Sequence, residues 1–214
     1  PGAEVKMVPN AGKLEMRVRG PNVFPGYLRR DDLTRAAFDE DGFYCIGDAG
    51  KFEDPDDPSK GIVFDGRVGE DFKLTTGTWV QAGMLRLSAV EAASPALQDA
   101  VVTGHNRDYI GLLAWPNPAG CGKLPGVDTD DLGALVASPV VREHVREALR
   151  ARNREQRGSA TRVERVLLMA EPPSLDANET TDKGYINQRA TLERRAALVE
   201  RLYADPPADD VIVL

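Results

Sequence analysis

The sequence predicts an α+β protein in which a short β-rich segment precedes a compact domain with a mixed sheet and flanking helices. Short apolar alternations separated by Pro-Asn and Gly-Pro turns fill residues 4–23, which is typical of antiparallel strands. Beyond the closely spaced Gly66 and Gly69, strands alternate with helices. Two such glycines permit a change of chain direction, so we expect one unit over residues 1–67 and another over 68–214.

The individual elements follow from local patterns along the chain. In the first unit we expect a short helix over 31–38, a strand over 43–46, an exposed polar loop over 51–60 and a strand over 61–64. In the second unit we expect strands over 72–75, 100–104, 110–115 and 163–169, helices over 84–93, 140–156 and 187–203, a Pro/Gly linker over 116–126, and an edge strand or docked segment over 211–214. Trp79 and Trp115 lie in apolar strand contexts and are expected in the core.

Composition limits the kinds of partner. The 214 residues are 42% hydrophobic and carry a net charge of −7, so no overall basic field attracts nucleic acid or an anionic membrane. No stretch approaches the about 18 apolar residues of a membrane span. Cys45 and Cys121 lie in no Cys-x-x-Cys pair and near no histidine, which indicates neither disulfides nor a zinc site and fits a reducing cytoplasm. The start at Pro1 leads us to expect a piece of a longer chain.

Three segments carry residues suited to nucleotide and phosphate chemistry. In residues 43–48 (Phe-Tyr-Cys-Ile-Gly-Asp), Asp48 follows an apolar strand, where a carboxylate can accept hydrogen bonds from both hydroxyls of a ribose. In residues 65–74, Arg67 offers a rigid fork of donors and Lys73 a point charge. Each has a plain structural alternative, because Asp48 can be a turn residue and residues 65–74 a charged turn between strands.

The third segment, residues 178–189, places Lys183 in a flexible polar loop ahead of a helix. Such a lysine can neutralise a carboxylate and a phosphate together. The alternative is a solvated loop with a helix cap.

In this order and spacing, the three segments resemble the superfamily of adenylate-forming acyl-CoA synthetases, peptide-synthetase adenylation domains and luciferases. Residues 12–15 (Gly-Lys-Leu-Glu) and 18–27 add to the resemblance, which covers nearly the whole chain. Residues 72–80 and 182–190 look most like the feruloyl-CoA synthetase group. The resemblance implies that residues 1–67 end a large N-terminal AMP-binding domain and that residues 68–214 form the C-terminal lid domain.

The resemblance also implies roles for individual residues. Asp48 would bind the ribose of ATP and AMP with help from Arg67, and Gly69 falls at the position of the hinge residue. The turn Thr76-Gly77 would line the CoA tunnel, and Lys183 would be the adenylation lysine. In most relatives that lysine directly follows the glycine, whereas here Tyr185 follows Gly184 and Lys183 precedes it. The stretch between Gly77 and Glu91, which includes Arg86, lacks the family's usual Pro and Glu pattern.

The implied activity is that of an ATP-dependent acid-thiol ligase acting on a small carboxylic acid, an aromatic one by the subgroup resemblance, and on CoA. The phosphate loop, the magnesium ligands and the acyl pocket would precede Pro1, so this chain alone is expected to be inactive and to hold no metal. Two other interpretations stay open: an adenylating enzyme that loads a carrier-protein thiol, and a non-catalytic interaction module that keeps the fold. The sequence indicates no oligomeric state.

Overall fold

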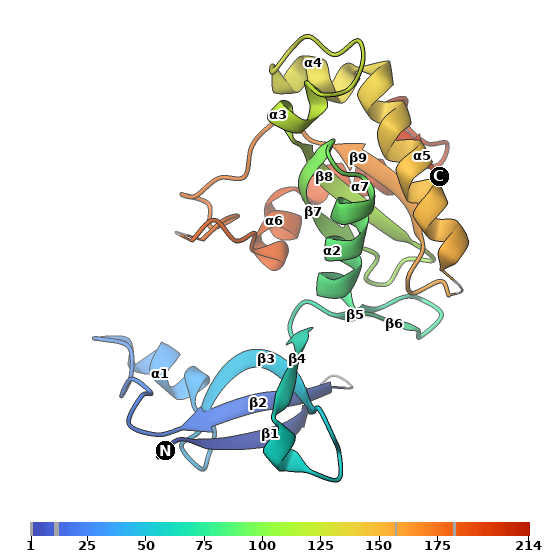
Figure 1. Ribbon diagram of the computed structural model, residues 1–214. Coiled ribbons are helices and arrows are strands. Elements are labelled where there is room, and N and C mark those ends of the chain that lie inside the picture. The colour runs from blue at the N-terminus through green and yellow to red at the C-terminus, as the bar shows by residue number, and fades with distance from the viewer. Residues whose placement is uncertain (1, 11–12, 157, 182) are drawn as a thin grey trace. The chain divides into compact units, whose positions relative to one another are not determined.

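The computed structural model describes residues 2–10, 13–156, 158–181 and 183–214. Two motif residues from the sequence analysis, Gly12 and Asp182, lie outside the described residues. The chain divides into two compact units, Pro1–Asp71 and Phe72–Leu214, which are described separately (Figure 1). Among the described residues, no helix combines the length and the apolar character needed to cross a bilayer.

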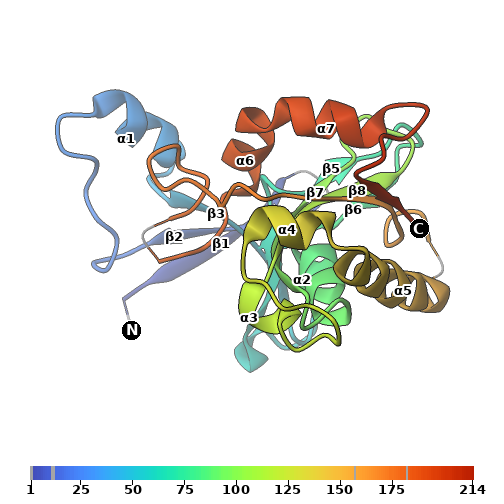
Figure 2. The same cartoon turned by 90° about the horizontal axis from the view of Figure 1, so that it is seen from above.

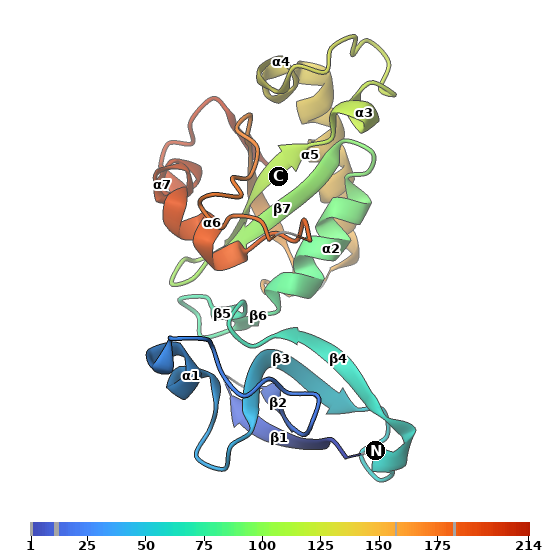
Figure 3. The same ribbon diagram turned by 90° about the vertical axis from the view of Figure 1, so that its left-hand side faces the viewer.

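The first unit is an antiparallel sheet with the strand order β1-β2-β3-β4, as the β-rich pattern predicted (Figure 3). Its elements are β1 (Glu4–Asn10), β2 (Lys13–Arg19), α1 (Asp31–Ala37), β3 (Tyr44–Phe52), the 3₁₀ turn η1 (Pro58–Lys60) and β4 (Ile62–Arg67). The prediction of a strand ending at residue 46 was wrong, because β3 continues through two glycines to Phe52. At Gly50 a Cβ atom would lie 2.6 Å from the Ile62 side chain, so glycine is what allows β4 to approach β3 here.

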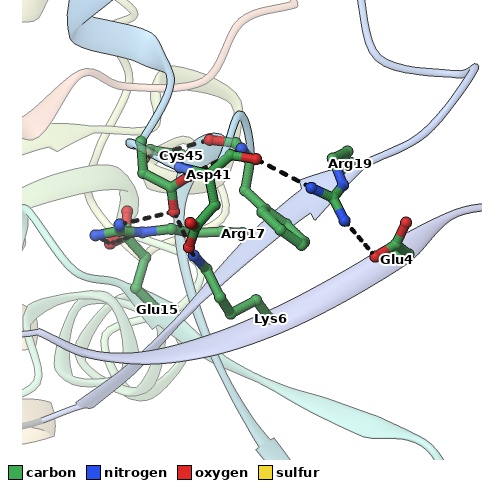
Figure 4. Close-up of polar contacts among 9 residues, drawn as sticks. Glu4, Lys6, Glu15, Arg17, Arg19, Asp41 and Cys45 are labelled. Carbon is green, nitrogen blue, oxygen red and sulfur yellow. Dashed lines mark hydrogen bonds and ion pairs between the residues drawn. The ribbon is translucent and has the colours of Figure 1, made fainter.

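A cluster of ion pairs joins the β1–β2 hairpin to the turn that leads into β3 (Figure 4). Lys6 Nζ lies 2.8 Å from Oδ2 of both Asp39 and Asp41, and Arg17 Nη1 lies 3.1 Å from Asp39 Oδ2. The hydrogen bond from Lys6 is the main reason that the pKa of Asp39 falls well below its usual range. Arg17 also binds Glu15 at 2.9 Å, so each charged group of the cluster has a partner of opposite charge.

The second unit is built on a mixed sheet with the strand order β10-β9-β8-β7, and a two-stranded hairpin precedes it. Strands β8 and β9 are parallel, and the other neighbours in the sheet are antiparallel. The parallel connection runs through three helices, as a crossover requires. The bounds are β5 (Phe72–Lys73), β6 (Trp79–Val80), α2 (Ala82–Ala92), β7 (Leu97–Thr103), β8 (Ile110–Pro116), α3 (Pro118–Cys121), α4 (Leu132–Ala137), α5 (Pro139–Glu155), β9 (Val163–Leu168), α6 (Gln188–Arg194), α7 (Ala196–Tyr203) and β10 (Val211–Val213).

Helices cover both faces of this sheet, so the predicted α+β class with flanking helices is confirmed. Figure 2 shows α2 and α5 on one side and α6 and α7 on the other. Along β8, Leu112 packs in the cluster with α2 and α5, whereas Leu113 packs with Leu202 of α7. All three of these leucines are fully buried. Burial of each such side chain stabilises the fold by about 1.5–3 kcal/mol, so β8 anchors both layers.

The prediction of one C-terminal helix over residues 187–203 was wrong, because the helix is broken at Arg195. The side chain of Arg195 is only 5% exposed. Its Nε donates to Glu179 Oε1 at 2.6 Å, and its Nη2 donates to the carbonyl of Pro172 at 3.0 Å. The break lets Arg195 reach these acceptors while α7 still buries Leu202 against the sheet.

Two further expectations needed correction, and one helix was missed. The stretch 116–126 contains α3, because the side chain of Asn117 accepts a hydrogen bond from Gly120 N at 3.0 Å and caps the helix. Helix α4, capped in the same way by Asp131, was not predicted. Trp79 is 39% exposed, with Lys73 Nζ 4.9 Å from its ring centroid, and so is not a core residue. Trp115 is buried, as expected.

Glu179 is fully buried and fully paired. Burial alone would raise its pKa. Hydrogen bonds from Arg195, from Ser174 N at 2.8 Å and from Arg194 outweigh that effect and lower the pKa of Glu179 to about 2. The ionised form is therefore the one that the fold favours.

This pKa predicts how stability depends on pH. The folded-state pKa of Glu179 lies below its ordinary value of 4.5, so its ionic contribution is complete above about pH 4.5 and is lost as the pH falls toward about 2. Urea unfolding of the wild type and of Glu179→Gln between pH 7 and pH 2.5 should give a stability difference of roughly 3 kcal/mol at neutral pH that shrinks on acidification. A difference that stayed constant over this range would contradict the assignment.

Candidate functional site

Asp48 and Arg67 face each other on neighbouring strands. The register of β3 and β4 pairs the two residues directly, and it shifts between Asp48 and Gly50, where the extra residue lies in β4. Arg67 Nε lies 3.2 Å from Asp48 Oδ1, at ion-pair distance. That contact lacks hydrogen-bond geometry, so within the described part of the chain no donor bonds to Oδ1, although this atom is buried. The Arg67 side chain is 63% exposed and leaves the carboxylate able to accept another donor.

The turn that follows β4 is tied to the same sheet. Val68 N donates to the carbonyl of Gly47 at 2.9 Å. Lys13 Nζ donates to the carbonyl of Asp65 and lies 2.6 Å from Asp71 Oδ2. The Lys13 and Asp71 side chains are only 8% and 4% exposed. Lys13 falls within one of the sequence motifs, but no local pattern indicates its role, because its partners lie more than fifty residues away.

The expected hinge residue, Gly69, lies within this turn. Its φ is outside the left-handed region, and a Cβ atom built on it would meet nothing within 4 Å. Gly66 instead has the conformation that favours glycine, with φ of +84°. The conformation of Gly69 seen here would therefore accept any small side chain.

Thr76 and Gly77 form the turn of the β5–β6 hairpin. Gly77 N donates to the carbonyl of Leu74 at 2.9 Å, and Gly77 has φ of +81°. The Thr76 hydroxyl lies 3.0 Å from that of Thr78. Thr75 Oγ1 donates to Asp108 Oδ1 at 2.6 Å and so fastens the hairpin to the loop between β7 and β8. The backbone at Gly77 is exposed and unobstructed by neighbouring side chains.

Lys183 lies in a turn that backbone hydrogen bonds close. Thr181 N donates to the carbonyl of Tyr185 at 2.9 Å, and Gly184 N donates to the carbonyl of Thr181 at 2.9 Å. A β-bridge between Thr180 and Ile186 closes the turn, and Gly184 adopts φ of +80°. Lys183 is exposed, and its ammonium makes no hydrogen bond or ion pair with the described residues.

The two remaining cations named from the sequence have structural contacts. Arg86 on α2 binds Asp99 on β7 through two hydrogen bonds of 2.7 and 2.8 Å, which engages its guanidinium within the fold. Lys73 lies over the Trp79 ring. The structure thus brings Asp48 and Arg67 together in the first unit and places Thr76, Gly77 and Lys183 in the second. In the described parts of the chain, no three His, Cys, Asp or Glu residues gather into a possible metal site.

A comparison with known families places this fold. Residues 73–206 match the family model described as the AMP-binding enzyme C-terminal domain. The chain belongs to this family. Most of the second unit lies within the match, including Thr76, Gly77 and Lys183.

Individual relatives of this chain are much longer than the chain itself. A probable acyl-activating enzyme 16, chloroplastic, from Arabidopsis thaliana is 25% identical over 210 residues, which cover 92% of this chain and 28% of the relative. A probable CoA ligase, CCL8, from Humulus lupulus is 32% identical over 117 residues, which cover 51% of this chain and 18% of the relative. The chain therefore spans less than a third of each relative's length.

A solved structure shares the fold of both units. The adenylation domain of a carboxylic acid reductase from Segniliparus rugosus, solved with AMP and a co-purified carboxylic acid, matches with a TM-score of 0.70 at 22% identity. The match covers 96% of this chain and 32% of that chain.

The turn at Gly77 permits a matched pair of substitutions. Gly77→Ala should destabilise the second unit by about 1–2 kcal/mol, because φ of +81° is costly for a residue with a Cβ atom. Gly69→Ala should be neutral or slightly stabilising, since its φ is not left-handed and its Cβ would meet open space. Urea unfolding of both variants measures the contrast. Equal losses would show that the Gly77 turn is not held as described.

Proposed function

We propose that this chain is the C-terminal portion of an AMP-forming acid-thiol ligase, which adenylates a carboxylic acid with ATP and transfers the acyl group to CoA. Residues 1–67 would end its AMP-binding domain, and residues 68–214 would form its mobile lid domain. Family membership over residues 73–206 supports the class of enzyme. The buried oxygen of Asp48 that receives no hydrogen bond from the described residues carries the nucleotide part of the proposal.

Asp48 suits a ribose because its Oδ1 atom accepts no hydrogen bond from the described residues. A buried acceptor without a donor costs about 1–3 kcal/mol, and a hydroxyl group of a bound nucleotide would supply that donor. Two carboxylate oxygens match the vicinal diol of a ribose, which presents two donors side by side. Arg67, exposed beside it, can add a donor to the ribose or a phosphate. The residues present therefore fit ATP and AMP.

Replacing Asp48 tests this site. In the full-length protein, Asp48→Asn should weaken ATP binding by roughly 10- to 100-fold, since a hydrogen bond to a charged group contributes about 1.5–3 kcal/mol. Isothermal titration with ATP measures the loss. Asp54→Asn, in the exposed loop after β3 where Asp54 binds Lys60 at 2.7 Å, is the control and should bind normally. A wild-type protein that bound neither ATP nor CoA would favour the interaction-module alternative.

Lys183 would act in the first step, in which the substrate carboxylate attacks the α-phosphate of ATP. Its exposed ammonium, without a partner among the described residues, is available to offset negative charge on the reacting oxygens. Magnesium would further neutralise the phosphates. In the second step, the thiol of CoA displaces AMP, and the unobstructed backbone at Thr76 and Gly77 would allow the pantetheine arm to pass closely.

The second step requires the lid domain to turn, and we place the pivot at Gly69. A glycine can adopt the dihedral angles of both states, and nothing crowds its Cβ position here. The acid would be aromatic, by the resemblance of residues 72–80 and 182–190 to feruloyl-CoA synthetases. Ferulate is thus the first substrate to offer, with a benzoate and a fatty acid beside it.

The two steps can be separated with two variants of the full-length enzyme. Lys183→Ala should lower adenylate formation by at least about 100-fold while sparing thioester formation from supplied acyl-adenylate. Gly69→Pro, which fixes φ near −65°, should show the opposite pattern. Pyrophosphate release and acyl-CoA formation measure the two steps. Intact adenylation in Lys183→Ala would rule out the lysine, and equal loss of both steps in Gly69→Pro would rule out the pivot.

A further inference from the structure

The turn that bears Lys183 is held at both of its ends by buried polar side chains. Glu179, just before the turn, is fully buried, and Gln188, just after it, is 4% exposed. Asn187 N donates to the carbonyl of Glu179 at 2.9 Å and joins the two ends. Between them, Lys183 is exposed and Tyr185 is 68% exposed. A turn with an exposed tip thus has a buried, hydrogen-bonded base.

At the first end, both carboxylate oxygens of Glu179 are engaged. Oε1 accepts from Arg195 Nε at 2.6 Å. Oε2 accepts from Arg195 Nη2 at 3.0 Å, from Arg194 Nη1 at 2.5 Å and from Ser174 N at 2.8 Å. The Arg195 guanidinium lies 5.4 Å from the ring centroid of Trp115, on β8. The first end is therefore connected to β8, an inner strand of the sheet.

At the second end, the side-chain amide of Gln188 makes the hydrogen bonds that a peptide group of a neighbouring strand would make. Its Nε2 donates to the carbonyl of Val102, and its Oε1 accepts from Val102 N, both at 2.9 Å. Val102 lies on β7, which is an outer strand of its sheet. The side-chain amide thus pairs with a strand edge as a neighbouring peptide group would, and this fixes its orientation.

Stability alone does not account for this arrangement. Burying a carboxylate with a guanidinium carries a desolvation cost that often equals its electrostatic gain, so apolar residues would serve the core as well. Charged and amide groups additionally fix the orientation of the segments that they join, because each hydrogen bond admits a narrow range of distances and angles. The group whose position they determine is the turn between them, and Lys183 is its charged residue.

We propose that Glu179 and Gln188 are positioning residues for Lys183. They touch no substrate, and they hold the base of the turn so that the ammonium is presented in one place during activation of the carboxylic acid. The inference rests on the proposed role of Lys183 in adenylate formation. It adds that the placement of this lysine depends on Arg195 and on the edge of β7.

The test uses the full-length protein with Glu179→Gln, Gln188→Glu and a control. The control, Glu193→Gln, breaks an exposed ion pair with Arg189 on α6, where the two side chains lie 2.8 Å apart. We expect Glu179→Gln and Gln188→Glu to lower kcat for adenylate formation by about tenfold or more, since small misplacements of a catalytic group are costly. The KM for ATP and thioester formation from supplied adenylate should stay within about twofold of the wild type. The control should match the wild type in every measurement.

Amide hydrogen exchange supplies a readout independent of activity. Thr181, Gly184 and Asn187, whose amides bond within the turn or at its base, should exchange faster in both variants and unchanged in the control. If both half-reactions fell together with the folded fraction, the two residues would be merely structural and the proposal overturned. Faster exchange with unchanged adenylation would overturn it equally.

Two further variants separate this inference from the function beneath it. If Lys183→Ala leaves adenylation intact, the role of the lysine fails, whatever Glu179 does. If Lys183→Ala abolishes adenylation but Glu179→Gln and Gln188→Glu do not affect it, only the positioning role fails. Should Glu179→Gln not fold, Arg194→Ala removes a half-exposed partner of Glu179 and leaves Arg195 in place. It should then show a smaller, selective loss of adenylation, and normal adenylation would contradict the proposal.

Discussion

Burial of β8 on both faces is the constraint from which the second unit follows. Because Leu112 and Leu113 point to opposite faces and neither is exposed, helices must cover both sides of the sheet. One layer comes from the crossover that the parallel pair β8–β9 requires, and the other from α6 and α7. The second layer brings Gln188 to the edge of β7 and Arg195 to Trp115. The turn with Lys183 is the segment that leads into this layer, so the sheet also determines where the lysine lies.

In the first unit, the turn after β4 depends on a different interaction, the buried pair of Lys13 and Asp71. Gly69 lies between two attachments to the sheet, Val68 through Gly47 and Asp71 through Lys13. Under the proposed hinge, a rotation about Gly69 moves Asp71 and must separate it from Lys13. Separating a buried ion pair is costly unless both charges find water or new partners. Gly69 permits the rotation, whereas the Lys13–Asp71 ion pair determines much of its free-energy cost.

The sequence predicted an element well where the interactions that determine it lie within that element. It failed where they involve residues far away in the sequence. The strand over 110–115 and the helix over 140–156 were predicted closely, because the apolar run of the strand and the helical spacing of apolar residues lie within each segment. The extension of β3 across Gly47 and Gly50 was missed, since Gly50 is required by its close packing against β4 and Gly47 has φ of +75°, and neither reason is visible in the sequence. The break at Arg195 was missed because its partner Glu179 lies sixteen residues away.

The candidate site divides in the same way. Residue chemistry and order pointed to Asp48, Arg67 and Lys183, and the structure adds that Asp48 and Arg67 are cross-strand neighbours. Lys13, Glu179 and Gln188 were not singled out, because each acts through a contact that only the folded chain creates. Gln188 and Val102 are 86 residues apart in the sequence. No local pattern distinguishes a glutamine that will pair with a strand edge from one in water.

The fully buried carboxylate of Glu179 and the partly buried carboxylate of Asp48 differ in how their oxygens are paired. Every oxygen of Glu179 receives hydrogen bonds from its own chain, so its ionised form is stabilised within the fold and has little capacity for a ligand. Asp48 Oδ1 is buried, yet no hydrogen bond from the described residues reaches it. Its contact with Arg67 is an ion pair without hydrogen-bond geometry, so a donor from a bound molecule would supply the hydrogen bond that this atom lacks. A fully paired carboxylate thus fixes geometry, whereas an incompletely paired one is suited to recognise a hydroxyl.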